Sequence, residues 1–246
     1  MIAIITGASS GIGQEFARQV DKMAYDEIWL IARRKERLVD LSNKLKSPSK
    51  ILALDLMDSH SYEILETELR ASRKKVGLLV NSAGVGRSSY FYDQDMADIE
   101  KTIKLNILAL TKMMSLAIPY MGPGSQIINV ASVAGFTPQP KFATYAASKS
   151  YVISLSRALN RELSLKGIHV SALCPNPVDT EFGPHHTSGI KKYAKEDLEK
   201  LVRYALKKSY RKDLITVAPS AKVMRIVGKI FPHSFIMWVE KIFNMY

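Results

Sequence analysis

The sequence predicts an α/β fold built around a doubly wound parallel sheet. Short apolar, β-branched runs alternate with longer segments of helical periodicity along most of the chain. Such alternation produces right-handed crossovers between parallel strands. Runs such as 127–130 are largely apolar on both faces, which is typical of a sheet covered by helices on both sides. The length of 246 residues and the hydrophobic fraction of 47% suit a single well-buried domain spanning 1–246.

The individual elements follow from hydrophobic periodicity. The expected strands are short runs rich in Ile, Leu and Val, at residues 2–6, 27–32, 50–55, 77–82, 126–131, 168–174 and 213–217. The expected helices occupy the intervals between them, near 11–24, 35–46, 58–74, 95–120 and 143–166. No repeat or low-complexity linker interrupts this pattern, so nothing divides the chain before about residue 183.

The last quarter of the chain departs from this alternation. A polar, helix-rich insertion at 183–212 precedes the last expected strand, and an extension at 219–246 carries two amphipathic stretches separated by Pro232. We expect the extension either to pack on the domain or across a dimer contact, or to lie on a membrane surface, since it combines basic and apolar faces. The apolar positions are Val223, Ile226, Val227 and Ile230 in the first stretch, and Phe235, Trp238, Val239 and Ile242 in the second.

Charge and cysteine content narrow the classes of partner. The net charge is +12, and residues 183–246 hold 13 Lys and Arg against 5 Asp and Glu. A solvated basic surface, anionic lipid and an acidic carrier all stay open, but no motif beyond charge indicates nucleic-acid binding. Cys174 is the only cysteine, which excludes an internal disulfide and a cysteine-based metal site. The first residues do not form a signal peptide, and no apolar run reaches the roughly 18 residues of a membrane span. We therefore expect a cytoplasmic protein, with peripheral membrane contact left open.

A glycine-rich turn follows the first expected strand, in the sequence Thr6-Gly7-Ala8-Ser9-Ser10-Gly11-Ile12-Gly13. Glycines let backbone N–H groups approach an anion closely, and the N-terminus of the following helix adds positive potential. A tight structural turn would also use glycine. This turn, however, lies at the first strand–helix junction of an alternating pattern, where a dinucleotide diphosphate binds.

The end of the second expected strand distinguishes the two nicotinamide cofactors. A carboxylate at this point would bind a ribose 2′-hydroxyl, whereas an arginine would accept a 2′-phosphate. No acid stands here, and Arg33 and Arg34 follow Ala32 directly. We therefore expect NADP(H) rather than NAD(H), although either arginine could simply begin a solvated helix.

A tyrosine and a lysine define the expected catalytic end of the site. Tyr145 and Lys149 are four residues apart and share one face of a helix. An ammonium near a phenol should lower the pKa of Tyr145 toward working pH. Ser132 follows the fifth expected strand, at the sheet edge that holds ligands in parallel sheets.

Taken together, these motifs resemble the short-chain dehydrogenase/reductase family over nearly the whole chain, in order and in spacing. The resemblance implies a Rossmann-type sheet and an enzyme that moves a hydride between NADP(H) and a carbonyl/alcohol pair, without a metal. The matching segments are Thr6–Gly13, Asp55, Asn81-Ser82-Ala83-Gly84, Asn106, Ser132, Tyr145–Lys149 and Pro175–Thr180.

The resemblance also implies a role for each catalytic residue. Tyr145 would exchange a proton with the substrate oxygen, and Ser132 would hydrogen-bond the same oxygen. Lys149 would hold the nicotinamide ribose and support the acidity of Tyr145. Asn106 would hold a water that relays protons through Lys149, although an ordinary polar helix position is its simpler interpretation.

The expected cofactor contacts come from the motifs and the resemblance together. Asp55 could instead cap the helix that begins near Ser59. Two positions depart from the family pattern, since Ser82 stands for a usual Asn and Asn176 for a usual Gly; Asn tolerates positive φ, so the turn could survive. The expected cofactor-binding residues are Gly7, Ser9, Ser10, Gly11, Ile12, Gly13, Arg33, Arg34, Asp55, Leu56, Asn81, Ala83, Gly84, Tyr145, Lys149, Pro175, Val178 and Thr180.

The substrate is less defined than the cofactor. We expect the pocket to be lined by Pro138-Gln139-Pro140, by Phe182, Gly183 and the pair His185-His186, and by part of the extension. Aromatic residues near these segments suggest a lipophilic ketone or aldehyde. A ketoacyl-carrier-protein reductase and a catalytically silent dinucleotide sensor are the alternatives, and the sensor would predict damaged catalytic positions. The resemblance further implies a homodimer or homotetramer.

Overall fold

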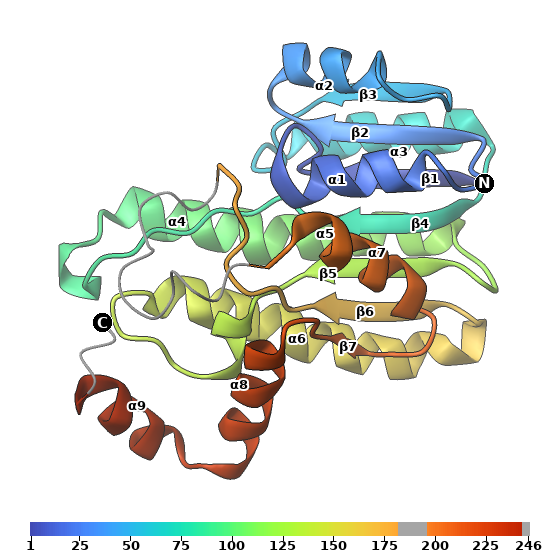
Figure 1. Cartoon of the computed structure of the whole chain (residues 1–246). Coiled ribbons are helices and arrows are strands. Elements are labelled where there is room, and N and C mark those ends of the chain that lie inside the picture. Colours follow the sequence, from blue (N-terminus) through green and yellow to red (C-terminus); the bar gives the residue numbers. More distant parts are fainter. Residues whose placement is uncertain (182–195, 243–246) are drawn as a thin grey trace.

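The computed structural model describes residues 1–181 and 196–242. Within them, seven strands form one parallel sheet in the order β3-β2-β1-β4-β5-β6-β7, which confirms the predicted doubly wound fold (Figure 1). The strands are β1 (Ile2–Thr6), β2 (Glu27–Ala32), β3 (Ser49–Ala53), β4 (Val76–Asn81), β5 (Gln126–Val130), β6 (His169–Leu173) and β7 (Leu214–Ile215).

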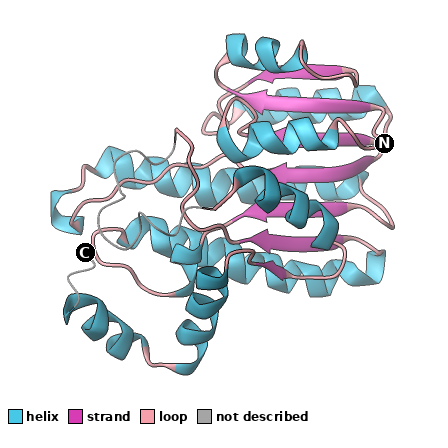
Figure 2. Cartoon of the chain, in the orientation of Figure 1, coloured by secondary structure: helices cyan, strands magenta, loops and turns pink. Residues whose placement is uncertain are grey.

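Helices cover both faces of the sheet (Figure 2). One layer contains α1 (Gly11–Val20), α2 (Lys35–Ser42) and α7 (Leu198–Lys208). The opposite layer contains α3 (His60–Ser72), α5 (Leu110–Ala117) and α6 (Ala143–Leu163). Two further helices, α8 (Pro219–Ile230) and α9 (His233–Ile242), lie beyond the carboxyl ends of the strands, as does α4 (Met96–Ile103) (Figure 1).

The sheet separates two apolar cores. Phe16, Leu38 and Leu201 belong to the first helical layer and pack against Ile5 of β1. The second core joins side chains of α3, α5 and α6 to the other face of the same strands. All five residues of β1 are buried. Each fully buried aliphatic or aromatic side chain contributes about 1.5–3 kcal/mol, so the two cores together fix the positions of the strand ends.

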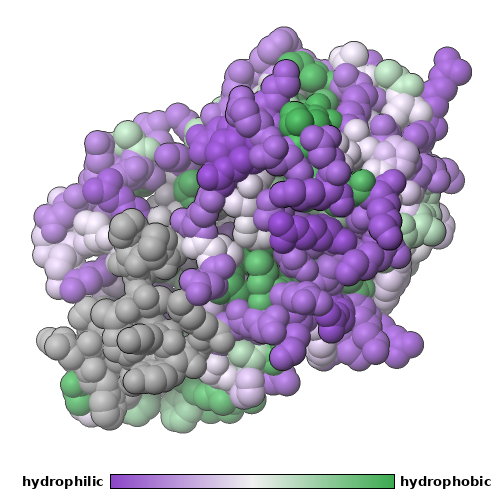
Figure 3. Space-filling view, turned by 45° about the horizontal axis from the view of Figure 1, so that its top comes forward, coloured by the Kyte–Doolittle hydropathy of each residue, from purple (hydrophilic) through white to green (hydrophobic). Residues whose placement is uncertain are grey.

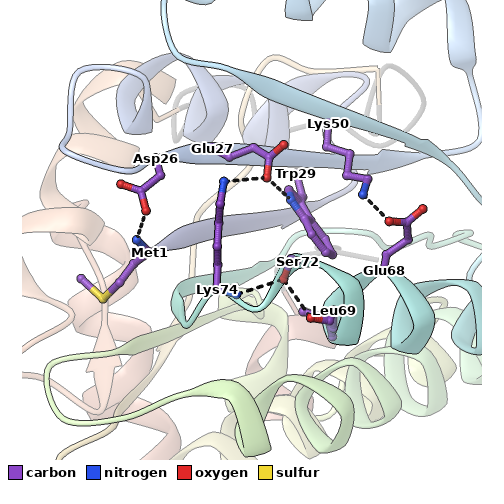
Figure 4. Close-up of polar contacts among 9 residues, drawn as sticks. All are labelled: Met1, Asp26, Glu27, Trp29, Lys50, Glu68, Leu69, Ser72 and Lys74. Carbon is purple, nitrogen blue, oxygen red and sulfur yellow. Dashed lines mark hydrogen bonds and ion pairs between the residues drawn. The ribbon is translucent and has the colours of Figure 1, made fainter.

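Trp29 ties β2 to the second helical layer (Figure 4). Its indole N–H donates to the Glu27 carboxylate at 3.0 Å, and Glu27 also pairs with Lys74 at 3.5 Å. The Lys50 ammonium lies 5.0 Å from the centre of the indole ring and pairs with Glu68 of α3. These contacts satisfy the polar edge of a large buried ring, away from the carboxyl ends of the strands.

Most predicted elements agree with the structure within two to four residues, and the differences lie at their ends or in their regularity. The expected strand 213–217 is reduced to the two residues of β7. The expected helix 95–120 is divided into α4, a π-helical segment η2 (Lys104–Ala109), α5 and a 3₁₀ turn η3 (Ile118–Tyr120). Short 3₁₀ segments also occur at η1 (Phe91–Asp93), η4 (Val133–Phe136) and η5 (Ser164–Lys166).

Candidate active site

The site is formed where the strands end. In this sheet β1 lies between β2 and β4, so the chain crosses over in opposite directions on the two sides of β1. Ligands of open parallel sheets bind at such a switch point. The segments that leave the carboxyl ends of the strands here are 7–13 after β1, 33–34 after β2, 82–86 after β4, 131–136 after β5 and 174–181 after β6.

The turn between β1 and α1 has the geometry of an anion cradle. Gly7 and Gly11 have φ of +67° and +54°, a region that side chains disfavour. A Cβ on Gly13 would lie 2.4 Å from the carbonyl oxygen of Gly7, so only glycine allows this close return of the chain. Ser9 is buried, and Ile12 packs on the first core. The N-cap residue of α1 is Ser10, whose side chain makes no capping hydrogen bond. The first-turn N–H groups are therefore available to a phosphate, which fits a dinucleotide.

Arg34 lies directly on this turn. Its Nε and Nη2 donate to the Ser9 hydroxyl at 3.2 and 3.0 Å, and Nη2 donates to the Ser10 hydroxyl at 2.8 Å. Its Nη1 donates to Glu181 at 2.7 Å, and Arg37 pairs with the same carboxylate. Hydrogen bonds from Arg34 and Arg37 lower the pKa of Glu181. Glu181 was not foreseen, because it is separated from Arg34 by almost 150 residues.

Arg33 diverges from Arg34 and approaches the expected adenine side. Its guanidinium is 3.9 Å from the Asp55 carboxylate. Asp55 accepts a hydrogen bond from the N–H of Met57 at 3.0 Å, so it closes the turn before α3, whose N-cap is Ser59. Leu56 beside it is buried. The helix-capping interpretation of Asp55 is therefore wrong for α3 itself.

The segment after β4 approaches β1 closely. Thr6 accepts the N–H groups of Ser82 and Ala83 at 3.0 and 3.2 Å, a role that the sequence did not reveal. The Asn81 side chain is buried and donates to Asn129 at 2.9 Å. The Asn81 side chain thus joins β4 to β5, and Ala83 and Gly84 follow it beyond the end of β4.

Tyr145, Ser132 and Lys149 are brought together as expected. α6 places Tyr145 and Lys149 one turn apart on its buried face, and η4 places Ser132 opposite them. Tyr145 is hydrogen-bonded to the Ser132 side chain. The Lys149 ammonium lies 5.5 Å from the centre of the Tyr145 ring and donates to the Val130 carbonyl oxygen at 2.8 Å. Phe142 stacks on the same ring, with centroids 4.3 Å apart.

The expected lowering of the Tyr145 pKa is wrong for this arrangement. Burial raises the pKa of Tyr145 to about 12, and its hydrogen bond to Ser132 opposes this rise only in part. Burial also lowers the pKa of Lys149 to about 8. The Lys149 ammonium is hydrogen-bonded to the Val130 carbonyl and lies beside the Tyr145 ring. The cost of desolvating a phenolate therefore outweighs the attraction of the ammonium for it, and the pKa of Tyr145 rises.

Asn106 lies in the π-helical segment η2 and is almost fully buried. Its amide accepts the N–H of Val85 at 2.9 Å and donates to the Val85 carbonyl and the Ser148 hydroxyl at 2.8 and 3.0 Å. A Cβ on Gly84 would lie 3.2 Å from Asn106 Oδ1 and 3.5 Å from Lys149 Nζ, so the three residues are neighbours. The Asn106 side chain is occupied by these hydrogen bonds to the protein. A water bound here would therefore contact the main chain of η2.

Two further glycines support the catalytic end and were missed from sequence. A Cβ on Gly86 would lie 2.6 Å from Cδ2 of Tyr145, and one on Gly135 would lie 2.7 Å from the Lys149 carbonyl carbon. Neither glycine has positive φ. Both are therefore needed for space beside α6, a requirement that has no local sequence signal.

The segment after β6 completes the crevice. The Pro175 carbonyl accepts the N–H of Val133 at 3.1 Å, and Val178 pairs with Glu196 as an isolated bridge. Thr180 lies against Gly11, since a Cβ there would be 3.0 Å from the Thr180 methyl. These contacts bring the ends of β5, β6 and β1 to one place.

Asn176 does not adopt the positive φ considered for it in place of the usual glycine. The positive-φ residues other than glycine in the described chain are Arg73 and Lys141, so Asn176 needs no left-handed conformation. Its N–H donates to Glu196 at 3.0 Å and its side chain donates to Ser220 at 2.6 Å. Glu196 also accepts the N–H of Ala218 at 2.7 Å, and its burial raises its pKa. Asn176 thus anchors α8 instead of closing a glycine-like turn.

The expected substrate pocket is described in part. Gln139 and Pro140 are half-buried, and Pro138 is exposed. Phe182, Gly183, His185 and His186 lie outside the described residues. Trp238 is 58% exposed on α9, where it stacks on Phe235. Phe142, at the start of α6, stacks on Tyr145 and adds an apolar ring to this end of the site.

Comparison with known proteins agrees with this geometry. The family model for short chain dehydrogenase matches residues 1–190. A short-chain dehydrogenase from Sphingobium yanoikuyae in complex with NADPH is 31% identical, with a TM-score of 0.78 over 93% of this chain and 92% of that one. The chain belongs to the short-chain dehydrogenase/reductase family and is an oxidoreductase of that family. Solved structures with this fold include that complex with NADPH and complexes of two Burkholderia short-chain dehydrogenases, one with NADP and one with NAD.

Two characterised relatives share most of the chain. Sulfoacetaldehyde reductase 2 of Chromohalobacter salexigens is 33% identical over 194 residues, which are 76% of this chain and 77% of that protein. The human very-long-chain 3-oxoacyl-CoA reductase is 31% identical over 190 residues, which are 73% of this chain. The aligned region spans 60% of the human protein.

Proposed function

We propose that this protein interconverts a carbonyl compound and an alcohol with NADP(H), on a lipophilic ketone or aldehyde. The observation that carries the proposal is the hydrogen-bonded pair of Tyr145 and Ser132 beside Lys149, at the same sheet edge as the glycine turn. The nicotinamide, when bound, supplies or accepts the hydride. The remaining chemistry is proton transfer and positioning by the protein.

The side chains divide this work. Burial keeps Tyr145 protonated, so it is ready to donate its proton to a carbonyl oxygen as negative charge develops there. Ser132 donates a second hydrogen bond to that oxygen. Lys149 binds the nicotinamide ribose hydroxyls and stabilises the tyrosinate that remains. Asn106 holds the relay water next to Lys149 through its main chain, because Val85 and Ser148 occupy its side chain.

The preference for NADP(H) rests on the residues after β2. Arg34 is held on the glycine turn by Ser9 and Ser10, and Arg33 is the next arginine after β2, 3.9 Å from Asp55 on the expected adenine side. Guanidinium groups bind phosphate through paired charge-assisted hydrogen bonds. The remaining cofactor contacts come from Gly7 to Gly13, from Asp55 and Leu56, from Asn81, Ala83 and Gly84, and from Pro175, Val178 and Thr180.

Substrate preference is supported by the apolar surroundings of Tyr145, above all Phe142. The relatives named above act on a 3-oxoacyl-CoA and on sulfoacetaldehyde, which are both anionic carbonyl compounds. A reductase of ketoacyl-carrier proteins stays an alternative, because an acidic carrier would complement the net charge of +12. A screen in which only small sugars or polyols react would contradict the lipophilic substrate.

The experiment that tests this function is NADPH consumption against a panel of aryl and alkyl ketones and aldehydes, with Tyr145→Phe measured in parallel. The substitution keeps the ring and removes the proton donor. We expect kcat to fall by at least about 100-fold, the usual size of general acid catalysis. NADPH fluorescence on binding shows whether the variant is folded. A Tyr145→Phe variant with most of its activity would refute the mechanism.

We further propose a cytoplasmic homodimer or homotetramer that uses the exposed faces of α4, η2 and α6. Ile103, Leu108 and Tyr151 are 45, 48 and 37% exposed there, so these helices offer apolar side chains to a second copy. Light scattering that finds only monomer at micromolar concentration would contradict this assembly. For the exposed apolar surface of α8 and α9 we propose a different role, peripheral contact with a membrane.

A further inference from the structure

One face of α8 is turned toward the catalytic end of the domain. Ala221, Arg225 and Gly228 are spaced i, i+4 and i+7 and therefore share that face. Ala221 is fully buried, and a Cβ on Gly228 would lie 2.7 Å from the carbonyl oxygen of Phe136 in η4. The position of Arg225 between them directs its side chain inward, toward η4 and the segment after β6.

Arg225 has no carboxylate partner in the part of the chain that the structure describes. It is half-buried, whereas Lys222 and Lys229 on the outer side of the same helix are exposed. Within residues 1–181 and 196–242, no ion pair or hydrogen bond of the Arg225 guanidinium is found, although many other arginines in this part of the chain pair with a carboxylate. Removing a guanidinium from water without a partner costs free energy, so the position favours an anion brought by a ligand.

The segments next to Arg225 are the ones that follow β5 and β6 at the catalytic end of the domain. Ser220, five residues earlier, binds Asn176, and Phe136 follows Ser132 by four residues. Burial raises the pKa of the Cys174 thiol, and the positive charges of Arg225 and Lys149 both oppose that rise. The two cations thus act on the same buried atom, which lies at the end of β6. Gly228, on the same face of α8, meets Phe136 of η4, so Arg225 faces the end of the sheet that carries Ser132 and Tyr145.

We propose that Arg225 binds an anionic group of the substrate, a carboxylate, sulfonate or phosphate, while the carbonyl carbon of the same molecule lies beside Tyr145 and Ser132. This inference rests on the proposed function and narrows its substrate class to oxo-acids and related anionic carbonyl compounds. The planar guanidinium offers paired donors that match such an anion. Arg225 is a residue for binding and specificity, with no part in proton transfer.

Matched acid and ester substrates test the proposal. We would measure kcat/KM with NADPH for 4-oxo-4-phenylbutanoate and 6-oxo-6-phenylhexanoate and for their methyl esters, which keep the ketone and ring but lack the charge. The wild type should prefer the acid of at least one pair by about 10- to 100-fold, the range of a charge-assisted hydrogen bond. Arg225→Met should bring this ratio to about 1, and Arg225→Lys should retain part of it.

A matched control and a binding measurement complete the design. Lys207→Met removes an exposed cation of α7 and should leave the acid-to-ester ratio unchanged. The NADPH-bound wild type should bind 4-phenylbutyrate, which has no ketone, about 10-fold more tightly than Arg225→Met does. Equal binding by the two proteins, or equal use of acid and ester by the wild type, overturns the role of Arg225. A wild type that reduces neither member of either pair contradicts the proposed function itself.

Discussion

At the scale of the residue, Gly86 shows how closely the catalytic tyrosine is confined. The position of a Cβ on Gly86 would be 2.6 Å from Cδ2 and 3.0 Å from Cε2 of Tyr145. We expect Gly86→Ala to push the ring away from Ser132, which lowers kcat by about 10-fold or more because misplacement by about 1 Å is costly. Steady-state kinetics with NADPH check this.

The control for Gly86 is another glycine. A Cβ on Gly122 would meet nothing within 4 Å, so Gly122→Ala should keep wild-type kcat. NADPH affinity should be similar in both variants, because neither glycine belongs to the phosphate turn. Full activity of Gly86→Ala would mean that the ring has more freedom than its surroundings suggest.

Arg34 supports a second prediction at this scale. Replacing it in Arg34→Gln removes the charge next to Ser9 and Ser10 but keeps a polar side chain. The NADPH dissociation constant should rise about 10- to 100-fold while that of NADH changes little, as expected for a lost charge-assisted contact to a 2′-phosphate. Isothermal titration with both cofactors measures this, with Arg70→Gln on α3 as the control. Equal weakening of both cofactors would remove the basis for NADP preference.

Residues in short motifs were predictable from sequence, and residues held across the chain were not. Tyr145 and Lys149 share a helix face at a spacing of four, so their proximity follows from local geometry. The pKa of Tyr145 did not follow, since it depends on burial that the tertiary fold creates. Glu181 and Glu196 act through partners distant in sequence, and the position of Arg225 on the face of α8 that meets η4 is likewise visible only in the folded chain.

At the scale of the element, the region 95–120 marks a limit of periodicity. The apolar pattern predicts a helix but does not separate a π-helical segment from a regular one, because both keep one face apolar. η2 turns Asn106 toward Val85 and Ser148. Similarly, β7 is shorter than expected because the chain leaves the sheet at Thr216 to begin α8 at Pro219.

The helices α8 and α9 carry the membrane prediction. Seven large apolar side chains on or between them are 45–68% exposed, beside Lys222 and Lys229, and apolar surface shows green along the lower edge of Figure 3. Vesicles that contain anionic phospholipid should sediment the wild type, and salt or neutral vesicles should weaken this, as for basic amphipathic helices. The apolar residues are Val223, Ile226, Ile230, Phe231, Phe235, Trp238 and Ile242.

A double variant defines the outcome for this surface. Ile226→Glu with Trp238→Glu should release the protein from vesicles, whereas Leu165→Glu, at an exposed position after α6, should not. If the wild type stays in the supernatant with anionic vesicles, or if light scattering shows that the double variant loses a dimer instead, the surface contacts protein and not lipid.

At the scale of the whole molecule, the active site reduces the stability of the fold. Burial lowers the pKa of Lys149 from 10.5 to about 8, so the unfolded chain binds this proton more tightly than the native protein between those values. The free energy of unfolding therefore rises with pH across this window. The cost of the buried charge is fully present below pH 8.

Lys149→Met tests this balance. At pH 7 the variant should be more stable than the wild type by about 1–3 kcal/mol, and the difference should shrink by pH 10. Buried tyrosines with raised pKa values lower the free energy of unfolding above pH 10 equally in both proteins. Their contribution therefore cancels in the difference between the variant and the wild type. Urea unfolding at pH 7, 8.5 and 10 measures the difference. A constant difference across this range would show that the pKa of Lys149 is the same in the native and the unfolded protein.

The overall architecture was almost fully predictable, because parallel strands that are apolar on both faces leave few alternatives to a doubly wound sheet. The helices α8 and α9 were predictable as amphipathic stretches, since Pro219 and Pro232 mark their starts. Their docking was not, because it depends on Ser220, Glu196 and the close approach of Gly228 to Phe136.

The short edge strand β7 has a consequence for how such a protein can diversify. The last segment joins the sheet through only two paired residues, Leu214 and Ile215, whereas the dinucleotide crevice draws on the long central strands. Exchange of everything beyond β7 for the corresponding piece of another sequence would replace the contacts of α8 with Asn176, Glu196 and Phe136, and would leave the pairing of the central strands intact. Selectivity and cofactor use can thus evolve as separate modules, with the hydride-transfer apparatus inherited unchanged.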